Sequence, residues 1–391
     1  MLDPAPEGSV PALGAAAPSV IVTHMEEAPP ITFARGAPSL DIVPVDDLKA
    51  AAQAAFEDDP KGAFSYGTAG GYGRLRDWIA DRHEVGREQV IATNGSMQAD
   101  AFLFQLLVHE GDTVVVEAPT YDRTLLALRE LRADILAIPM QPDGVDVDAL
   151  AQALEAGARP KLAHIIPNFH NPAGATLSLE KRRRLLELAA HYEFIVFEDD
   201  PYGELRFEGE SLPTMLSLDT ENRVVYASSF SKTICPGIRT GYLVGPKASI
   251  AAIEQRATST YISPNMVAEA IVAEFCRSGA LSRSIETVKV ALRERRDATC
   301  QALRRELPDA RFTPPEGGYF LWVELPEGSD VDALAAAARD RGVIFVKGTD
   351  FMLEGGLNTL RLAYSGVTPD QIAEGIGRLA EAYRGLAVAA A

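Results

Sequence analysis

The chain has 391 residues, 47% of them hydrophobic and 24% charged, which is enough for a large domain with a deep core and a smaller second domain. Its net charge of −18 argues against nucleic acid or an anionic membrane as a partner, because binding to phosphates requires clustered Lys and Arg. No apolar run approaches the roughly 18 residues of a membrane-spanning helix, and the N-terminus lacks the basic region of a signal peptide. Three widely spaced cysteines and scattered histidines predict neither a disulfide framework nor a metal site. We therefore expect a cytoplasmic protein.

Residues 1–28 are rich in Pro, Ala and Gly, and we expect a flexible N-terminal arm there. Residues 29–280 are expected to form the large domain, with 29–45 packing against the small one. Apolar runs alternate with helical patterns in this region, which predicts a three-layer α/β domain with a mostly parallel, seven-stranded sheet. The seven predicted strands are Gln89–Ala92, Thr113–Glu117, Asp134–Ile138, Leu162–Ile166, Phe194–Glu198, Arg223–Ala227 and Gly241–Val244.

Residues 281–391 are expected to form a smaller α/β domain. A long amphipathic helical pattern leads into it from about Ala280. Three strands and a final helix are predicted after this pattern, at Tyr319–Glu324, Val343–Val346, Thr359–Tyr364 and from about Pro369.

The unusual polar residues follow the predicted strands, and the carboxyl ends of such strands are where α/β sheets bind ligands. Lys232 lies between two strand-like runs, near Ser229, Ser231 and Arg239. A lysine held in this way suits Schiff-base chemistry, because a nearby cation favours the neutral, nucleophilic amine. A lone lysine is, however, more often a solvated surface residue.

Three other strand ends leave alternatives open. The turn Gly95-Ser96-Met97 opens a helix and could bind an anion or simply cap that helix. Tyr121 could stack on a ligand ring or cover the core. The acids after the fifth strand, Asp199 and Asp200, need partners because burying them is costly.

Together these segments resemble the pyridoxal 5'-phosphate (PLP) aminotransferases of the aspartate-aminotransferase fold, fold type I. The pattern S-x-S-K-x(6)-R-x-G-(Y/F), from Ser229 to Tyr242, is similar to the lysine segment of that family. The order T-x-G-S-x-Q-A, N-P-x-G, D-x-x-Y and the lysine segment matches the order in the family. The 2-aminoadipate/kynurenine-type branch is the nearest resemblance.

The resemblance implies a cofactor site. Lys232 would carry PLP as a Schiff base and then shuttle a proton, and Asp199 would pair with the pyridine nitrogen. The D-x-x-Y spacing favours Asp199 over Asp200 for this pairing. The resemblance implies that Tyr202 and Asn171 contact the phenolic oxygen of the cofactor. The remaining implied cofactor contacts are Tyr121 stacked on the ring, and Gly95, Ser96, Met97, Ser229, Ser231 and Arg239 around the phosphate.

The resemblance also implies a homodimer, in which Tyr66 reaches the phosphate of the neighbouring subunit. Arg361, with Asn171, would bind the substrate α-carboxylate. Arg35-Gly36 departs from the Gly-Gly that is common in relatives, and we expect both residues on the substrate side.

Lys347 departs from the family pattern in the same way, and Arg123 follows Tyr121 closely. We expect a pocket for an acidic or polar side chain if these cations line it, although solvated surface charges are the default for such residues.

We thus expect an aminotransferase that exchanges an amino group between an L-amino acid and a 2-oxo acid by ping-pong chemistry, with glutamate and 2-oxoglutarate as one pair. One alternative is another PLP reaction at the α-carbon: a decarboxylase, β-lyase, racemase or oxidase. The other is a non-catalytic effector-binding protein.

Overall fold

The computed structural model describes residues 29–390, so the arm predicted at residues 1–28 lies outside the described part. The strands of its central sheet are β2 (Val90–Thr93), β3 (Thr113–Ala118), β4 (Asp134–Gln141), β5 (Gly144–Val145), β6 (Pro160–Ile165), β7 (Ile195–Asp199), β8 (Val224–Ser229) and β9 (Gly241–Val244). Their order is β2-β9-β8-β7-β6-β3-β4-β5. All seven predicted strands are present and the sheet is mostly parallel, but it has an eighth strand.

The eighth strand, β5, corrects the predicted count. It has two residues and folds back antiparallel onto β4, pairing Met140 with Val145. Gly144, with a φ of 105°, allows this reversal because it has no side chain to strain. A strand of this length leaves no apolar run in the sequence, so pattern alone does not reveal it.

Strand β9 runs antiparallel to both of its neighbours, β2 and β8. Its first residue, Gly241, pairs with Ser229, the last residue of β8. The start of β9 therefore lies at the same sheet edge as the carboxyl ends of the parallel strands, and the loop that carries Lys232 spans that edge.

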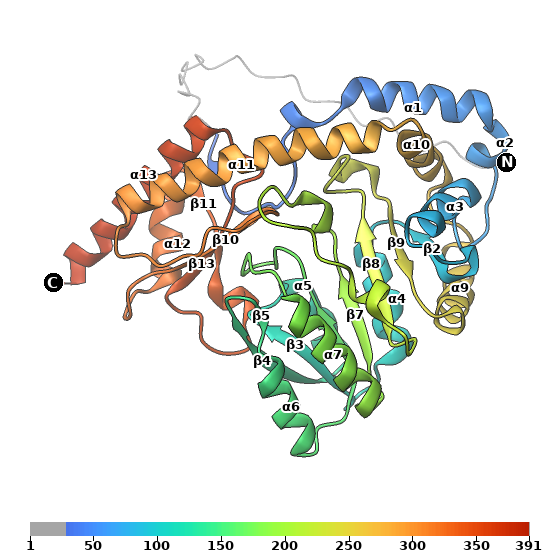
Figure 1. Ribbon diagram of the computed structural model, residues 1–391. Helices are drawn as coiled ribbons and strands as arrows, with labels where there is room; N and C mark the ends of the chain where they lie inside the picture. The colour runs from blue at the N-terminus through green and yellow to red at the C-terminus, as the bar shows by residue number, and fades with distance from the viewer. Residues whose placement is uncertain (1–28, 391) are drawn as a thin grey trace, which may run out of the picture.

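Helices cover both faces of this sheet (Figure 1). Alternate side chains of β3 point to opposite faces of the sheet and contact different helix layers. Val114 and Val116 pack with α4, α5 and α9, whereas Val115 packs with α6 and α7. The bounds are α4 (Ser96–Leu107), α5 (Asp122–Glu130), α6 (Val147–Glu155), α7 (Leu179–Tyr192) and α9 (Lys247–Tyr261). The three-layer architecture thus agrees with the predicted fold class.

Shorter elements complete the large domain. They are α1 (Val45–Asp58), α2 (Pro60–Phe64), α3 (Gly73–Arg82), α8 (Met215–Leu218), α10 (Met266–Arg277) and the 3-10 turns Leu40–Ile42, Arg87–Gln89, Gly203–Leu205 and Pro236–Ile238.

The C-terminal part forms a second, smaller α/β unit. Its elements are β10 (Phe320–Glu324), α12 (Val331–Arg339), β11 (Val343–Ile344), β12 (Val346–Lys347), a 3-10 turn (Gly348–Phe351), β13 (Thr359–Ala363) and α13 (Pro369–Ala390). Strands β10, β13 and β12 form one antiparallel sheet. The predicted strand Val343–Val346 is divided, because β11 pairs instead with β1 (Ile31–Thr32), near the start of the described chain.

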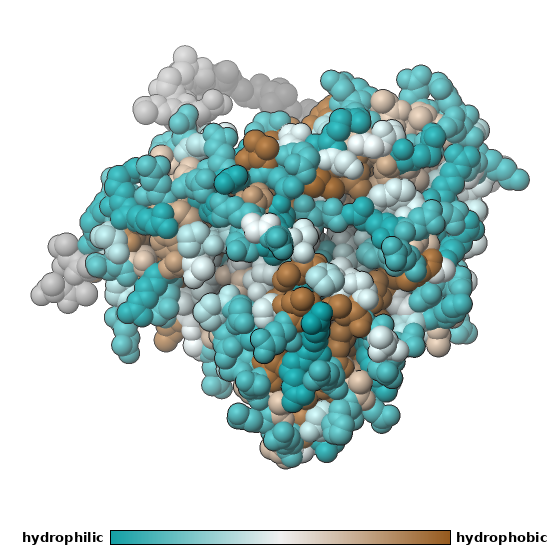
Figure 2. Space-filling view, in the orientation of Figure 1, coloured by the Kyte–Doolittle hydropathy of each residue, from teal (hydrophilic) through white to brown (hydrophobic). Residues whose placement is uncertain are grey.

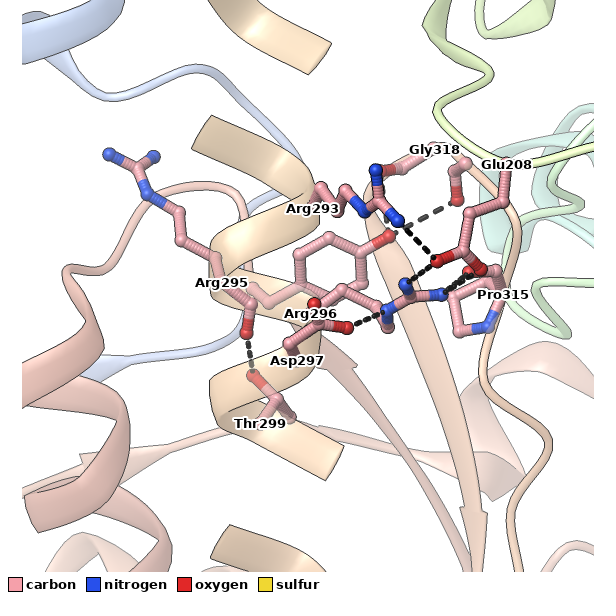
Figure 3. A network of polar contacts seen from close by, with 10 residues as sticks. Glu208, Arg293, Arg295, Arg296, Asp297, Thr299, Pro315 and Gly318 are labelled. Atoms are coloured by element: carbon pink, nitrogen blue, oxygen red, sulfur yellow. Dashed lines mark hydrogen bonds and ion pairs between the residues drawn. The ribbon is translucent and has the colours of Figure 1, made fainter. Parts of the chain in front are cut away.

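Helix α11 (Ala280–Glu306) runs along the molecule from α10 to α13 (Figure 1). Its buried Arg296 donates from Nη2 to Glu208 Oε1 at 2.6 Å and from Nη1 to the carbonyl of Pro315 (Figure 3). Arg293 Nη2 lies 3.5 Å from the same Glu208 oxygen. One helix therefore ties a loop of the large domain to a loop that leads into β10.

The face of the molecule shown in Figure 2 is largely hydrophilic, with hydrophobic residues gathered near its middle. Among residues 29–390, no helix has the length and apolar character needed to cross a membrane.

Candidate active site

A cavity of about 150 Å³ lies at the sheet edge where the parallel strands end. The segments after β2, β3, β6 and β7 and the loop that joins β8 to β9 all contribute to its walls. The lining residues are Ser96, Met97, Tyr121, Ile166, Asn171, Asp199, Pro201, Tyr202, Ser229, Ser231, Lys232, Pro236 and Arg239. The structure thus brings together most of the residues expected to contact a cofactor.

One end of the cavity is suited to a phosphate. Gly95 precedes the first residue of α4 with a φ of 89°, and an added Cβ there would lie 2.4 Å from Arg239 Nη2. A Cβ on Gly241 would similarly lie 2.6 Å from the backbone nitrogen of Ser96. Glycine at both positions lets the guanidinium approach the N-terminus of α4, where free N–H groups and the helix dipole favour an anion.

Two hydroxyl groups extend this cradle. Ser229 Oγ donates to Ser231 Oγ at 3.0 Å, and Arg239 Nη1 donates to the same Ser231 oxygen at 3.4 Å. Arg239 itself has a left-handed backbone, with a φ of 48°. These groups and the helix N-terminus fit a dianionic phosphate, because they supply donors and a positive charge without a competing carboxylate among the lining residues at this end.

Asp199 is suited to a protonated ring nitrogen. It is the last residue of β7 and is buried, and its Oδ1 has no hydrogen-bond partner among the described residues. Its other oxygen lies 3.5 Å from His164 Nε2. Asp200 points to the opposite side of the strand end, where it accepts from Asn168 Nδ2 at 2.9 Å. The geometry therefore favours Asp199 over Asp200 as the acid that faces the cavity.

Lys232 lies across the cavity and is held at both ends. Its Nζ donates to the carbonyl of Gly36, and its own carbonyl accepts from the Tyr319 hydroxyl at 2.6 Å. Burial, followed by the positive charges of Arg361 and Arg239, lowers the pKa of Lys232 to about 8 against the opposing effect of Asp199. A substantial fraction of the amine is therefore neutral and nucleophilic near physiological pH.

Tyr202 and Tyr121 supply ring surface and hydroxyl groups. The ring centroid of Tyr202 lies 5.7 Å from Lys232 Nζ and 5.7 Å from the ring of Phe320, in an edge-on arrangement. Burial raises the pKa of both tyrosines well above its ordinary value, so both phenols stay protonated and can donate hydrogen bonds.

Arg361 reaches the same region from β13 of the small domain. Its Nη1 donates to Asn171 Oδ1 at 2.8 Å, and Nη2 donates to the carbonyl of Ala34. The guanidinium lies 4.4 Å from the ring centroid of Phe320. The side chain is buried, and no carboxylate pairs with it among the described residues. A buried cation without an acid partner is suited to bind an anionic ligand.

The remaining predicted contacts, of Arg35 and Gly36 with substrate and of Tyr66 with the phosphate of the neighbouring subunit, are less closely grouped. Arg35 and Tyr66 are exposed, and neither lines the cavity. Gly36 lies next to it, because its carbonyl holds Lys232, and an added Cβ would lie 2.2 Å from Phe320 Cζ.

The other two cations at departures from the family pattern have acidic neighbours. Lys347 forms an ion pair with Asp332 on α12. Arg123 Nε lies 3.5 Å from Asp122 Oδ2 on the surface of α5. Neither side chain lines the cavity.

Three residues near the site were not identified from the sequence. His164 is a polar residue inside a buried strand, and Asp100 lies on the buried side of α4, so each interrupts an apolar pattern that could have marked it. Tyr319 had no such signal, because its contact with the lysine loop joins positions far apart in the chain.

Comparison with known proteins gives a family. Residues 29–379 match the model of the family described as aminotransferase class I and II. The aromatic-amino-acid aminotransferase 1 of Thermococcus litoralis is 35% identical over 363 residues, which cover 90% of this chain and 87% of the relative. The 2-aminoadipate transaminase of Thermus thermophilus is 35% identical over 361 residues, covering 91% and 90%.

Solved structures agree with these relatives. LysN, an α-aminoadipate aminotransferase from Thermus thermophilus solved with N-(5'-phosphopyridoxyl)-L-leucine, has a TM-score of 0.88 and 34% identity, over 92% of this chain and 93% of LysN. A Pyrococcus horikoshii kynurenine aminotransferase also has a TM-score of 0.88, with 35% identity over 92% of each chain. The chain therefore belongs to the class I and II aminotransferases, which are PLP-dependent transaminases of the aspartate-aminotransferase fold.

Proposed function

We propose that this aminotransferase moves an amino group from an L-amino acid to a 2-oxo acid in two half-reactions that share one site, with glutamate and 2-oxoglutarate as one pair. The observation that carries the proposal is Arg361, a buried guanidinium without a carboxylate partner in the described chain. Its positive charge helps to lower the pKa of Lys232, which favours the neutral amine. One site with one carboxylate clamp can receive both substrates in turn, because each has the same α-carboxylate.

The cofactor, when bound, supplies an electron sink for the negative charge that develops at the substrate α-carbon. We assign its phosphate to Ser96, Ser229, Ser231 and Arg239, with the backbone of Gly95 and Met97, since these groups form the cationic end of the cavity. Asp199 Oδ1, which has no other partner among the described residues, is assigned to the ring nitrogen.

Three further side chains complete this cofactor assignment. Tyr121, which lines the cavity, would cover the face of the ring. Tyr202 and Asn171 donate to the phenolic oxygen, because the Tyr202 phenol stays protonated and Asn171 lines the same wall of the cavity.

Lys232 has two roles in this proposal. Its Nζ is the point of covalent attachment for the cofactor. Once the substrate has displaced Lys232 from this attachment, the neutral amine takes the proton from the substrate α-carbon. The protonated amine would then give that proton to the cofactor carbon to which Lys232 had been attached. A pKa near 8 suits both directions, because the amine can be neutral or charged near physiological pH.

Substrate binding is assigned to Arg361, Asn171, Arg35 and Gly36. Asn171 Oδ1 already orients the guanidinium of Arg361, which leaves the amide nitrogen of Asn171 free to donate to the carboxylate. Arg35 has an exposed side chain without an ion pair in the described chain, so it is available to an acidic substrate side chain. Lys347 is a weaker candidate, because Asp332 already pairs with it.

We also propose a homodimer, in which Tyr66 completes the phosphate site of the partner. Its side chain is 87% exposed, which is unusual for a large ring beside a glycine-rich loop and is consistent with a subunit contact. We further propose a large domain at 29–280, a small domain at 281–391 and a cytoplasmic location. The three described cysteines are all free, as a reducing compartment requires.

The test adds single amino acids to the purified holoenzyme without an acceptor. We expect the cofactor absorbance to change and the matching 2-oxo acid to be released in one equivalent per site. Release of carbon dioxide, ammonia or peroxide instead would assign the chain to another PLP reaction. Lys232→Ala should abolish the change, whereas Lys61→Ala, at an exposed lysine, should not.

A second measurement tests the carboxylate clamp and the side-chain contact separately. Arg361→Ala should raise KM for every amino acid by about 100-fold, because a bidentate charge pair of about 3 kcal/mol is lost. Arg35→Ala should reduce the rate for 2-aminoadipate relative to phenylalanine. An unchanged ratio would remove Arg35 from the pocket and leave the assignment of Arg361 intact.

A further inference from the structure

Asp100 is a buried acid that the proposed chemistry does not use. It lies in α4 with 9% of its surface exposed, and Phe104 follows one turn later on the same face of the helix. The ring of Phe104 meets His164 edge-on at 5.9 Å, and His164 Nε2 lies 3.5 Å from Asp199 Oδ2. This face of α4 is therefore turned toward the floor of the cofactor cavity, and Asp100 faces the Asp199 end.

Several polar atoms in this cluster have no hydrogen-bond partner among the described residues. They are Asp100 Oδ1, Asp199 Oδ1 and both ring nitrogens of His164. No lysine or arginine of the described chain forms an ion pair with Asp100. Two ionised carboxylates in this buried cluster would repel each other, and no cation pairs with Asp100 to compensate.

The local electrostatics decide which acid gives up its charge. Burial raises the pKa of Asp100 well above its usual value, and the negative charge of Asp199 raises it further. The other titratable groups that interact with the pair are His164, Tyr121, Tyr202, Asp200 and Lys232. The phenols of Tyr121 and Tyr202 stay protonated because burial raises the pKa of each. Asp199 has the histidine beside it, whereas Asp100 has no such partner.

We propose that Asp100 is a positioning residue that acts through Asp199: it remains an uncharged acid, so that the pair carries one negative charge and that charge faces the cofactor. The proposal rests on the assignment of Asp199 to the ring nitrogen. A neutral Asp100 keeps a proton that it can donate toward Asp199 through a bound water, and so fix the orientation of the carboxylate.

The proposal has a consequence for Lys232. A second negative charge in the cluster would favour the protonated form of this amine, as the charge of Asp199 already does. An uncharged Asp100 therefore helps to keep the lysine amine neutral and nucleophilic.

The test compares Asp100→Asn and Asp100→Ala holoenzymes with wild type. The infrared difference spectrum, wild type minus Asp100→Asn, should contain the carbonyl band of one protonated buried carboxyl group, because the bands of Glu269 and Glu198, whose pKa burial also raises, are common to both proteins and cancel. The matched control is Asp148→Asn, at an exposed acid in the first turn of α6, which should keep the band. This measurement does not depend on activity or on the role of Asp199, so it separates a failure of this proposal from a failure of the proposed function.

Kinetics then test the positioning role. Asp100→Asn, which is uncharged at every pH, should retain kcat within about twofold, whereas Asp100→Ala should lower kcat about tenfold with little change in KM, because Asp199 loses a partner worth about 1–2 kcal/mol. The absorbance of the bound cofactor should change at high pH in wild type as Asp100 ionises, but not in Asp100→Asn. Equal losses of kcat in the two variants, or a difference spectrum without a carboxyl band, would overturn the proposal.

Discussion

Removal of the Arg361 guanidinium is expected to raise the pKa of Lys232 and to reduce the reactivity of its amine at neutral pH. Burial is the largest cause of the lowering from 10.5 to about 8, and Arg361 is the largest electrostatic cause. This lowering makes the neutral fraction of the amine about 300-fold larger at pH 7 than in an ordinary lysine. Arg361→Gln removes the charge and keeps a shorter, polar side chain, so the pKa of Lys232 should rise by about one pH unit.

The assay measures the rate at which an amine-acylating reagent modifies Lys232 in the full chain freed of cofactor, as a function of pH. Peptide mass spectrometry resolves Lys232 from other lysines, and exposed Lys61 provides the reference curve in the same sample. The midpoint for Lys232, rather than its absolute rate, reports the pKa, because burial also slows access of the reagent. We expect the midpoint near pH 8 in wild type and higher in Arg361→Gln, yet below that of Lys61.

Two results would refute this reasoning. A wild-type midpoint equal to that of Lys61 would mean that burial does not destabilise the charged amine. A midpoint that Arg361→Gln leaves unchanged would mean that the two cations do not interact in the protein, and the carboxylate clamp would then lie farther from Lys232 than the structure places it.

Three other predictions concern stability and cofactor affinity. Arg296→Ala should lower the free energy of unfolding in urea by about 1–3 kcal/mol, because its buried guanidinium ties two loops to α11; a smaller loss would mean that water replaces it. Gly95→Ala should weaken PLP binding in a titration about tenfold, because its Cβ would displace Arg239, whereas Gly111→Ala, with a similar φ of 82° but no neighbour within 4 Å, should not. Burial raises the pKa of Glu269 to about 8, because the folded protein favours the uncharged carboxyl group. The stability that this group contributes is therefore fully present below about pH 4.5 and is lost as the pH rises toward 8. Glu269→Gln should therefore gain at least about 1 kcal/mol relative to wild type between pH 5 and pH 8 in urea unfolding, and an equal pH dependence of the two proteins would contradict this.

Local sequence patterns predicted those parts of the fold that depend on burial. The centres of β3 (Val114–Val116) and β8 (Val224–Ala227) are continuous apolar runs, because both faces are covered, and such runs are visible without any knowledge of partners. The same patterns located Lys232 and Asp199, since a polar residue directly after a buried strand lies at the binding edge of the sheet. Assignment of roles to these residues still required the family resemblance.

The features that the sequence did not reveal depend on contacts between distant positions. Division of the predicted strand Val343–Val346 follows from pairing with Ile31, which no local pattern encodes. The ion pair of Lys347 with Asp332 likewise depends on how α12 packs beside β12. Tyr319 contacts the lysine loop only because the two domains meet there. A pattern reports whether a residue is buried, but it does not report which residue covers it.

The reversal of β9 has a consequence for protein engineering. Ser229 and Gly241 are paired neighbours, so the segment between them leaves the sheet and returns to it at nearly the same point. This segment carries Ser231, Lys232 and Arg239, and it can be regarded as a cassette whose two ends share one anchor. Exchange of the cassette between relatives would transplant the nucleophile and part of its anion cradle together, while the register of every strand in the sheet stays the same.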